Sequence, residues 1–421
     1  MYFLSGATRQ DTVTQQQTAQ QAFAKAQSDI DTVEGNGRDL VSTDPENAKK
    51  YLTDAYTELG IARDNGYEQA QLSDSFAKVV ADLNRYFHVT TVNPQTVLSF
   101  QTDDLKSLVL GPDGAAYVLD STTSKVYRVN LDTGASLAVV WVNQASQNGG
   151  GIIGAPKLMT ANGSDVLILD AFNSLWRWHP APGDKTGRGS PLKVFIPDNV
   201  TWGVGPLAMG TFMVNASLNQ YNFYIVVPSQ NQILKYTPNV DGSGYSTDGR
   251  TAYLKPPQDV SHVSDMYIDG NIYLVDQAKI TRYNLSQAVT GWKPDPPGDE
   301  LLRPAPKYKL ITADVLSQET GIFYAYDNLN QRIVAFKKVD GAIVGQYMAP
   351  STTPWFTNMT GMFVVPGANN TPPTLYWIEG GSLMRAVLGS SSSTGSAPSG
   401  SSKPSSSPSR SAPAASGSTK P

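Results

Sequence analysis

Apolar residues follow two different spacings along the 421-residue chain. In the segment 18–33 they recur at every third or fourth position, which is the period of one face of an α-helix. A second stripe runs over 48–62 and begins after Pro45, a residue that suits the first turn of a helix. A third stripe covers 70–83. Together they predict a helical region over 8–90, in which the second and third helices form a hairpin.

Beyond this region a block of about 50 residues recurs six times. Each copy has a short apolar run that ends in an acid or a proline, then a polar turn and another short apolar run. The residues that end the first run are Asp120, Asp170, Pro228, Asp276, Asp327 and Glu379. Short strands in a unit of this length bury their faces by stacking on neighbouring units. The repeat therefore predicts a six-bladed β-propeller over 96–388.

The last copy supplies only three strands before Gly389. The segment 97–100 precedes the first copy and is left without a partner. Pairing it as the outer strand of the sixth blade would close the ring and remove two exposed sheet edges. The predicted fold class is mainly β, a six-bladed β-propeller preceded by an N-terminal α-helical hairpin or stalk.

Both ends of the chain differ from these two regions. Residues 389–421 are almost all Ser, Pro, Gly, Ala and Thr, a composition that predicts a disordered tail. Residues 1–7 begin with four apolar residues and have no basic start. We interpret them either as a frayed terminus or as the stub of an upstream segment, such as a membrane anchor.

Composition narrows the classes of function. Charged residues make up 16% of the chain, and the net charge of −4 gives no electrostatic reason to expect nucleic acid as a partner. The chain has no cysteine, which excludes disulfides, thiolate metal sites and cysteine nucleophiles.

Two blades carry a family resemblance. The segments 111–120 and 125–129 resemble an NHL-type repeat, as does 324–336. The order of a helical stretch and then a propeller is similar to the extracytoplasmic sensor region of bacterial membrane-bound serine/threonine phosphatases or kinases. That resemblance implies a cell-surface or secreted location. The helical hairpin also resembles one tetratricopeptide-like unit.

Motifs for catalysis are weak. The segment 149–154 spells a glycine-rich nucleotide pattern, but it joins two predicted blades instead of a strand and a helix, so we interpret it as a loop. The repeated acids such as Asp120 each precede a turn, where a carboxylate accepts backbone N–H bonds, and we expect them to be structural. We therefore predict that the chain is not an enzyme, and we assign no catalytic residue, metal or cofactor.

Aromatic residues indicate a binding face instead. Trp202 and Trp355 stand at equivalent positions before two inner strands, and His262, Asp104 and Lys157 fall on the same predicted face. Aromatic rings with a few polar groups suit a protein, peptide or glycan ligand. The principal hypothesis is a non-catalytic extracytoplasmic sensor or scaffold module that binds such a ligand through these five residues.

Two alternatives stay open. A calcium-dependent, lactonase-like hydrolase would hold its ion between acids near the inner strands, where Asp104, Asp265 and Asp259 are the candidates. A structural cell-surface or filament subunit would self-associate through the N-terminal helices and the Ser/Pro-rich tail.

Overall fold

The computed structural model describes residues 4–389, apart from 147–148, 162–163, 181–190, 198, 204, 242, 316, 353–354 and 370, with side chains from Thr12 on. The predicted tail therefore lies, except for Gly389, outside the described residues. Among those residues, no helix is long and apolar enough to cross a membrane.

The N-terminal region is helical, as predicted. It contains α1 (Leu4–Glu34), a 3₁₀ turn, the short α2 (Leu40–Thr43), α3 (Pro45–Asp64) and α4 (Gln69–Tyr86). Pro45 begins α3 at its first position, where its missing N–H costs no hydrogen bond. Apolar side chains such as Ala26, Ala55 and Leu59 are fully buried between the helices and form their shared core.

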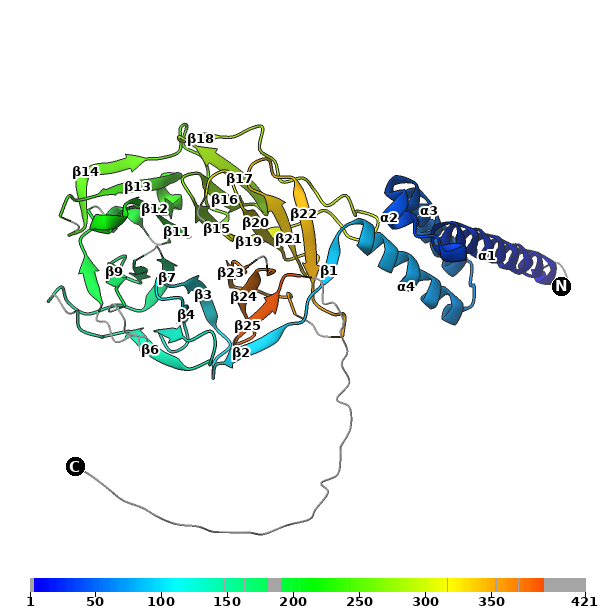
Figure 1. The fold of residues 1–421 in the computed structure, drawn as a ribbon, viewed down its shortest axis with the longest axis horizontal. Coiled ribbons are helices and arrows are strands. Elements are labelled where there is room, and N and C mark those ends of the chain that lie inside the picture. The colour runs from blue at the N-terminus through cyan, green and yellow to red at the C-terminus, as the bar shows by residue number, and fades with distance from the viewer. Residues whose placement is uncertain are drawn as a thin grey trace, which may run out of the picture. The chain divides into compact units, whose positions relative to one another are not determined.

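Six antiparallel sheets follow, and they confirm the predicted propeller (Figure 1). Their strands are β3 (Leu105–Leu110), β4 (Ala116–Asp120), β5 (Lys125–Val129) and β6 (Ser136–Trp141) in blade one; β7 (Pro156–Ala161), β8 (Val166–Asp170), β9 (Leu175–Trp178) and β10 (Leu192–Val194) in blade two; β11 (Met209–Asn215), β12 (Gln220–Val227), β13 (Gln232–Pro238) and β14 (Tyr245–Ala252) in blade three; β15 (Val263–Ile268), β16 (Ile272–Asp276), β17 (Lys279–Asn284) and β18 (Gln287–Ala288) in blade four; β19 (Tyr308–Ala313), β20 (Ile322–Asp327), β21 (Arg332–Lys337) and β22 (Ile343–Met348) in blade five; and β23 (Gly361–Val365), β24 (Thr374–Glu379) and β25 (Ser382–Val387) in blade six.

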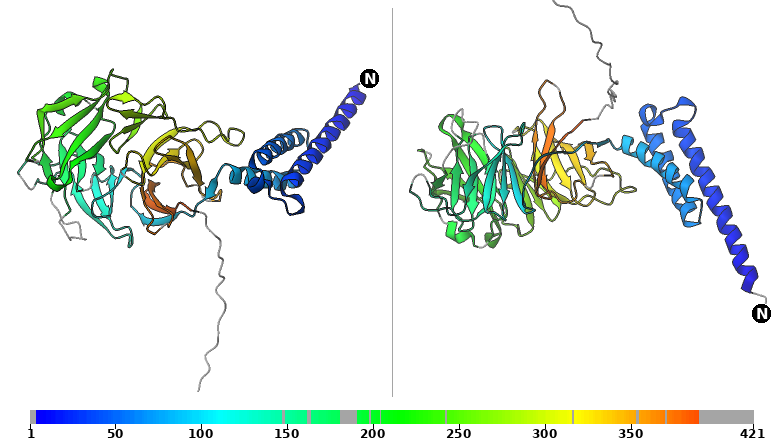
Figure 2. Two further views of the ribbon diagram at one scale, coloured as in Figure 1. Left: turned by 45° about the horizontal axis from the view of Figure 1, so that its top comes forward. Right: turned by 90° about the horizontal axis from the view of Figure 1, so that it is seen from below.

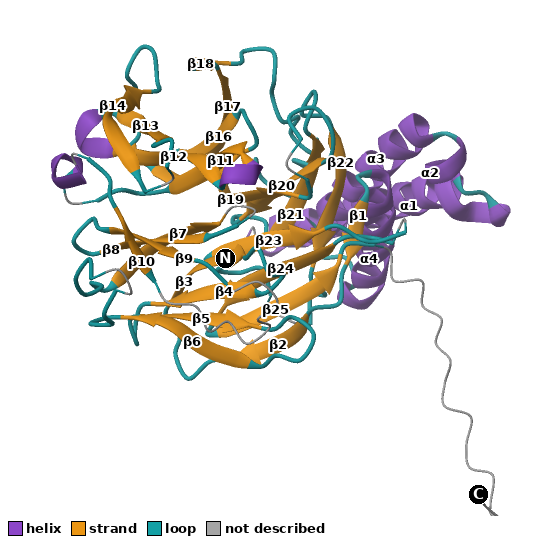
Figure 3. Ribbon diagram, turned by 60° about the vertical axis from the view of Figure 1, so that its left-hand side comes forward, coloured by secondary structure: helices purple, strands orange, loops and turns teal. Residues whose placement is uncertain are grey.

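The first strand of each blade lies nearest the centre of the ring, and the two views in Figure 2 show the same succession of sheets. The middle strands have almost no solvent exposure; every residue of β4 and of β8 is buried. Apart from three short 3₁₀ turns, the described residues after Tyr86 contain no helix (Figure 3).

The ring closes as predicted. The strand β2 (Gln95–Ser99) pairs antiparallel with β25, with Leu98 opposite Leu383 and Ser99 opposite Ser382. It is the fourth strand of blade six, and the last sheet therefore combines both ends of the propeller sequence.

Blade five has a fifth strand that the sequence analysis did not predict. The strand β1 (Val89–Thr91) pairs parallel with the outer strand β22. Beneath this pairing, the fully buried Arg332 donates hydrogen bonds to Asp327 and Asp299, and it also bonds Gln346. The Gln346 amide then donates to the backbone carbonyl of Phe87 at 3.1 Å, so this buried network reaches the end of the helical region.

The repeated acids are structural, as expected. Asp170 Oδ1 accepts the backbone N–H groups of Phe172 and Ser174, each at 2.9 Å, and its Oδ2 accepts the indole N–H of Trp176 at 2.8 Å. In blade six Glu379 accepts three consecutive backbone N–H groups, of residues 356, 357 and 358.

Candidate functional site: the axial cavity

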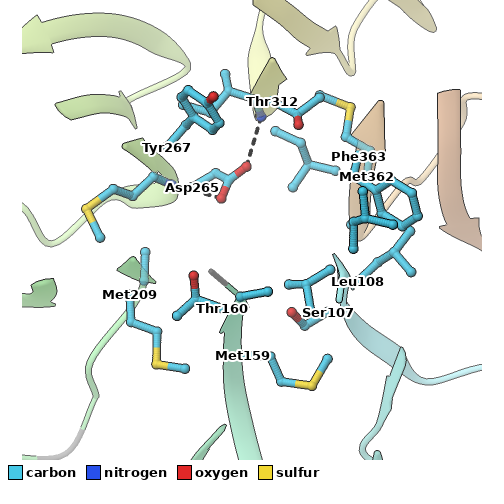
Figure 4. A pocket seen from close by; sticks show the side chains of 18 of the residues that line it. Ser107, Leu108, Met159, Thr160, Met209, Asp265, Tyr267, Thr312, Met362 and Phe363 are labelled. Carbon is cyan, nitrogen blue, oxygen red and sulfur yellow. Dashed lines mark hydrogen bonds between the residues drawn. The ribbon is translucent and has the colours of Figure 1, made fainter. Parts of the chain in front are cut away.

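A cavity of about 520 Å³ lies on the propeller axis, between the inner strands of all six blades. Most of its wall is apolar, and its deeper side chains include Leu108, Met159, Met266 and Met362. Figure 4 shows these side chains around an open centre, with a carboxylate and a few hydroxyl groups among them. A cavity of this size and polarity is typical of a small-molecule site.

The inner strands of blades six and one lie close to each other, with backbone atoms near contact distance. At Gly361 an added Cβ would lie 2.8 Å from the backbone nitrogen of Leu108, so glycine is required for blade six to approach blade one. The Thr360 hydroxyl donates to the carbonyl of Leu105 at 2.7 Å and joins the same two blades.

Four inner strands begin with a β-bulge at the same position. The register shifts between Leu105 and Ser107, Pro156 and Leu158, Val263 and Asp265, and Tyr308 and Leu310. A bulge inserts one extra residue and redirects its side chain. The inserted residues are Lys106, Lys157, Ser264 and Lys309.

Lys106 and Lys157 line one end of the cavity, and Lys309 occupies the equivalent bulge of blade five. We call these three residues the lysine mouth. Lys106 pairs with Asp104, and the Lys309 ammonium group donates to the amide oxygen of Asn358 at 3.1 Å. Burial lowers the pKa of Lys309, and the positive charge of Lys106 lowers it further.

Asp265 is the carboxyl group next to this mouth. Its Oδ1 accepts the backbone N–H of Met266 and its Oδ2 accepts that of Ile311, both at 2.8 Å. Burial raises the pKa of Asp265 to about 7, and the two N–H donors offset only part of that effect. The second cavity carboxyl, Asp314, follows the opposite end of β19 and accepts the N–H of Ile322 at 2.9 Å.

Several hydroxyl groups also line the cavity, among them those of Ser107 and Thr160. Neither hydroxyl has a hydrogen-bond partner among the residues that the structure describes. Both are therefore available to donate to a ligand, on the side of the cavity that faces Asp265 in Figure 4.

The structure separates the five residues that we predicted to bind a ligand. Trp202 is only 1% exposed, and its indole N–H donates to the Tyr236 hydroxyl at 2.8 Å inside the core of blades two and three. Trp355 is partly buried and packs against the core shared by blades five and six. These two tryptophans hold blades together, and they do not form a pair of exposed aromatic rings.

Of the remaining three, Lys157 lines the cavity and Asp104 lies beside it through its pairing with Lys106. His262 is exposed, and its Nδ1 lies 3.0 Å from the Ser261 hydroxyl outside the cavity lining. Of the five predicted residues, the structure thus places Lys157 in the cavity wall and Asp104 next to it.

The acids considered for calcium do not converge. Within the described residues there is no group of three His, Cys, Asp or Glu side chains that could hold a metal ion. Asp259 is exposed and accepts the N–H of Ser261 at 2.9 Å, whereas Asp265 is bonded to the backbone of two strands. The residues present therefore do not fit an axial calcium site.

Lys106 and Lys309 were missed by the sequence analysis, and Asp265 was considered only as a calcium ligand. The available signal was a lysine directly after the first buried residue of an inner strand, in Leu105-Lys106, Pro156-Lys157 and Tyr308-Lys309. The loops before these strands differ in length, and this obscures the equivalence in the linear sequence.

No protein-family model matches the chain, and no curated protein matches its sequence. The NHL-type and sensor-region resemblances, the location outside the cytoplasm and the self-association through the helices therefore stay predictions.

Solved structures do share the fold. A virginiamycin B lyase from Staphylococcus aureus is 14% identical, with a TM-score of 0.42 over 70% of this chain and 99% of that one. A gluconolactonase from Xanthomonas campestris is 11% identical, with a TM-score of 0.43 over 70% and 89%. The calcium-binding protein regucalcin from Agrobacterium tumefaciens is 11% identical, with a TM-score of 0.44 over 72% and 95%.

These comparisons contradict the prediction of a non-catalytic sensor or scaffold that is not an enzyme. The proteins they name include a lyase and a gluconolactonase. We correct that prediction and do not retain it.

Proposed function

We propose that this protein is a hydrolase that acts on a small, mainly apolar ester or lactone in the axial cavity, with Asp265 as the general base. The observation that carries the proposal is a carboxyl group whose pKa is about 7, placed in the wall of an apolar cavity. A group with such a pKa is suited to proton transfer at neutral pH.

The reaction needs two proton transfers. Asp265 takes a proton from a water molecule as the water oxygen forms a bond to the acyl carbon. The negative charge that develops on the carbonyl oxygen is stabilised by the hydroxyl groups of Ser107 and Thr160. The protonated Asp265 then returns its proton to the leaving alkoxide as the acyl C–O bond breaks.

The backbone holds Asp265 for this role. The N–H groups of Met266 and Ile311 fix both carboxylate oxygens from two different blades. Each oxygen keeps a further lone pair, since it accepts one hydrogen bond from the part of the chain that the structure describes.

The test uses Asp265→Asn, which keeps the shape of the side chain and removes the base. With p-nitrophenyl esters and γ-lactones of increasing chain length as probes, we expect kcat/KM to fall by about 10²–10³-fold. Asp314→Asn, at the other end of the same cavity, is the matched control and should retain the activity. Equal activity of Asp265→Asn and the native protein would refute the proposal.

A further inference from the structure

The lysine mouth has no role in the proton transfers described above. Lys106 and Lys157 line the end of the cavity where the inner strands begin, and Lys309 occupies the equivalent bulge in blade five. Going round the ring, these residues come from blades two, one and five, with the neutral Thr360 of blade six between the last two.

The carboxyl groups at this end are those of Asp104, Glu379 and Asp265, and they engage the three lysines to different degrees. Asp104 is paired with Lys106. Glu379, which also acts on Lys309, is 5% exposed and is bonded to three backbone N–H groups. Lys157 has no hydrogen-bond or ion-pair partner in the described part of the chain.

Burial lowers the pKa of Lys309, and the positive charge of the nearby Lys106 lowers it further. An anion placed between them would remove this repulsion and would accept hydrogen bonds from ammonium groups. Deeper in the cavity, the side chains are those of Leu108, Met159 and Met266, which cannot compensate a charge.

We propose that the lysine mouth binds the anionic head group of an amphipathic ligand, a carboxylate in the first instance, while its apolar chain lies in the axial cavity. This inference rests on the proposed function, because it names the substrate class of the same cavity: an apolar ester or lactone that carries a separate negative group.

The test measures binding instead of turnover. Isothermal titration of the full chain with decanoate and with decanol compares two ligands of equal chain length that differ in charge. We expect decanoate to bind about tenfold more tightly at low salt, and we expect this preference to shrink at high salt.

The variant Lys106→Gln/Lys157→Gln/Lys309→Gln should lose the preference for decanoate and bind decanol as the native protein does. Lys337→Gln is the control. This exposed lysine is the last residue of β21, at the opposite end of the strand from the turn that precedes it. Equal binding of the two ligands by the native protein, or a preference that survives in the triple variant, would overturn the inference.

The two proposals fail separately. If Asp265→Asn keeps full esterase activity while the preference for decanoate depends on the lysines, only the catalytic role of Asp265 is lost. If neutral and anionic ligands bind alike while Asp265→Asn is inactive, only the head-group inference is lost.

Discussion

The backbone N–H of Ile311 donates a 2.8 Å hydrogen bond to Oδ2 of Asp265, so a carboxylate on the inner strand of blade four bonds the inner strand of blade five. This contact holds the carboxyl group of β15 that lines the cavity. The stability of the fold and the proposed reaction therefore both depend on the protonation of one side chain.

The raised pKa of Asp265 predicts how stability changes with pH. In the folded state the group keeps its proton up to about pH 7, whereas in the unfolded chain it loses it near pH 4. Its contribution to the free energy of unfolding is therefore complete below pH 4 and is lost as the pH rises to 7. Asp265→Asn can accept only one of the two N–H groups, which costs stability at every pH. Relative to the native protein, it should nevertheless gain about 1–2 kcal/mol between pH 4 and pH 8. Urea unfolding at the two pH values measures both differences.

The same group predicts the pH dependence of esterase activity. Only the deprotonated carboxylate can accept a proton, so kcat/KM should rise with pH and level off above an apparent pKa near 7. A pH profile that is flat between pH 5 and pH 9 would exclude Asp265 as the base.

Replacing Glu379 should cause a large loss of stability. Replacing it with Ala leaves three backbone N–H groups of residues 356–358 without their acceptor in a buried turn. We expect Glu379→Ala to lower the free energy of unfolding by about 2–4 kcal/mol. Glu379→Gln keeps one acceptor oxygen and should lose less, which thermal denaturation of the two variants can establish. Equal losses would show that the acceptor is not the cause.

Replacing Arg332 should cause a second loss of stability, in blade five. Arg332→Met leaves the carboxylates of Asp299 and Asp327 buried without the guanidinium group that both of them bond. The cost should be about 3–5 kcal/mol. Asp327 then has no cationic partner among the described residues, whereas Asp299 keeps its ion pair with Arg303. Urea unfolding of the variant and of the native protein at pH 7 measures the loss.

Ring closure can be tested by truncation. A chain that starts at Asn93 lacks the helices and β1 but keeps β2, whereas one that starts at Thr102 lacks β2 as well and leaves β25 unpaired at an edge. We expect the shorter chain to melt roughly 10 °C below the longer one. Equal melting temperatures would mean that β2 does not hold the ring closed.

The propeller could be predicted from the sequence because its repeat depends on local features. Five of the six blades end their second strand with an acid, and acids such as Asp120 and Asp170 bond the turn that follows them whatever the neighbouring blades contain. The pairing of β2 followed from counting strands. The fifth strand of blade five could not be counted in this way, since β1 is three residues long and pairs parallel with β22.

The site was harder to predict because it is formed by side chains that are distant in sequence. Trp202 has the composition expected of a binding residue, but its hydrogen bond to Tyr236 and its burial are tertiary effects. Lys106 and Lys309 meet only because two bulges 203 positions apart lie at the same height in a closed ring. The raised pKa of Asp265 likewise depends on burial that a linear pattern does not contain.

The segment from β1 to β2 is hydrogen-bonded first to blade five and then to blade six. A mechanical load on the helices is thereby shared by two neighbouring sheets, and it acts where the beginning and the end of the ring are joined. Tension from the N-terminal side would have to break the hydrogen bonds of both β1 and β2 before it acted on the inner strands of the propeller.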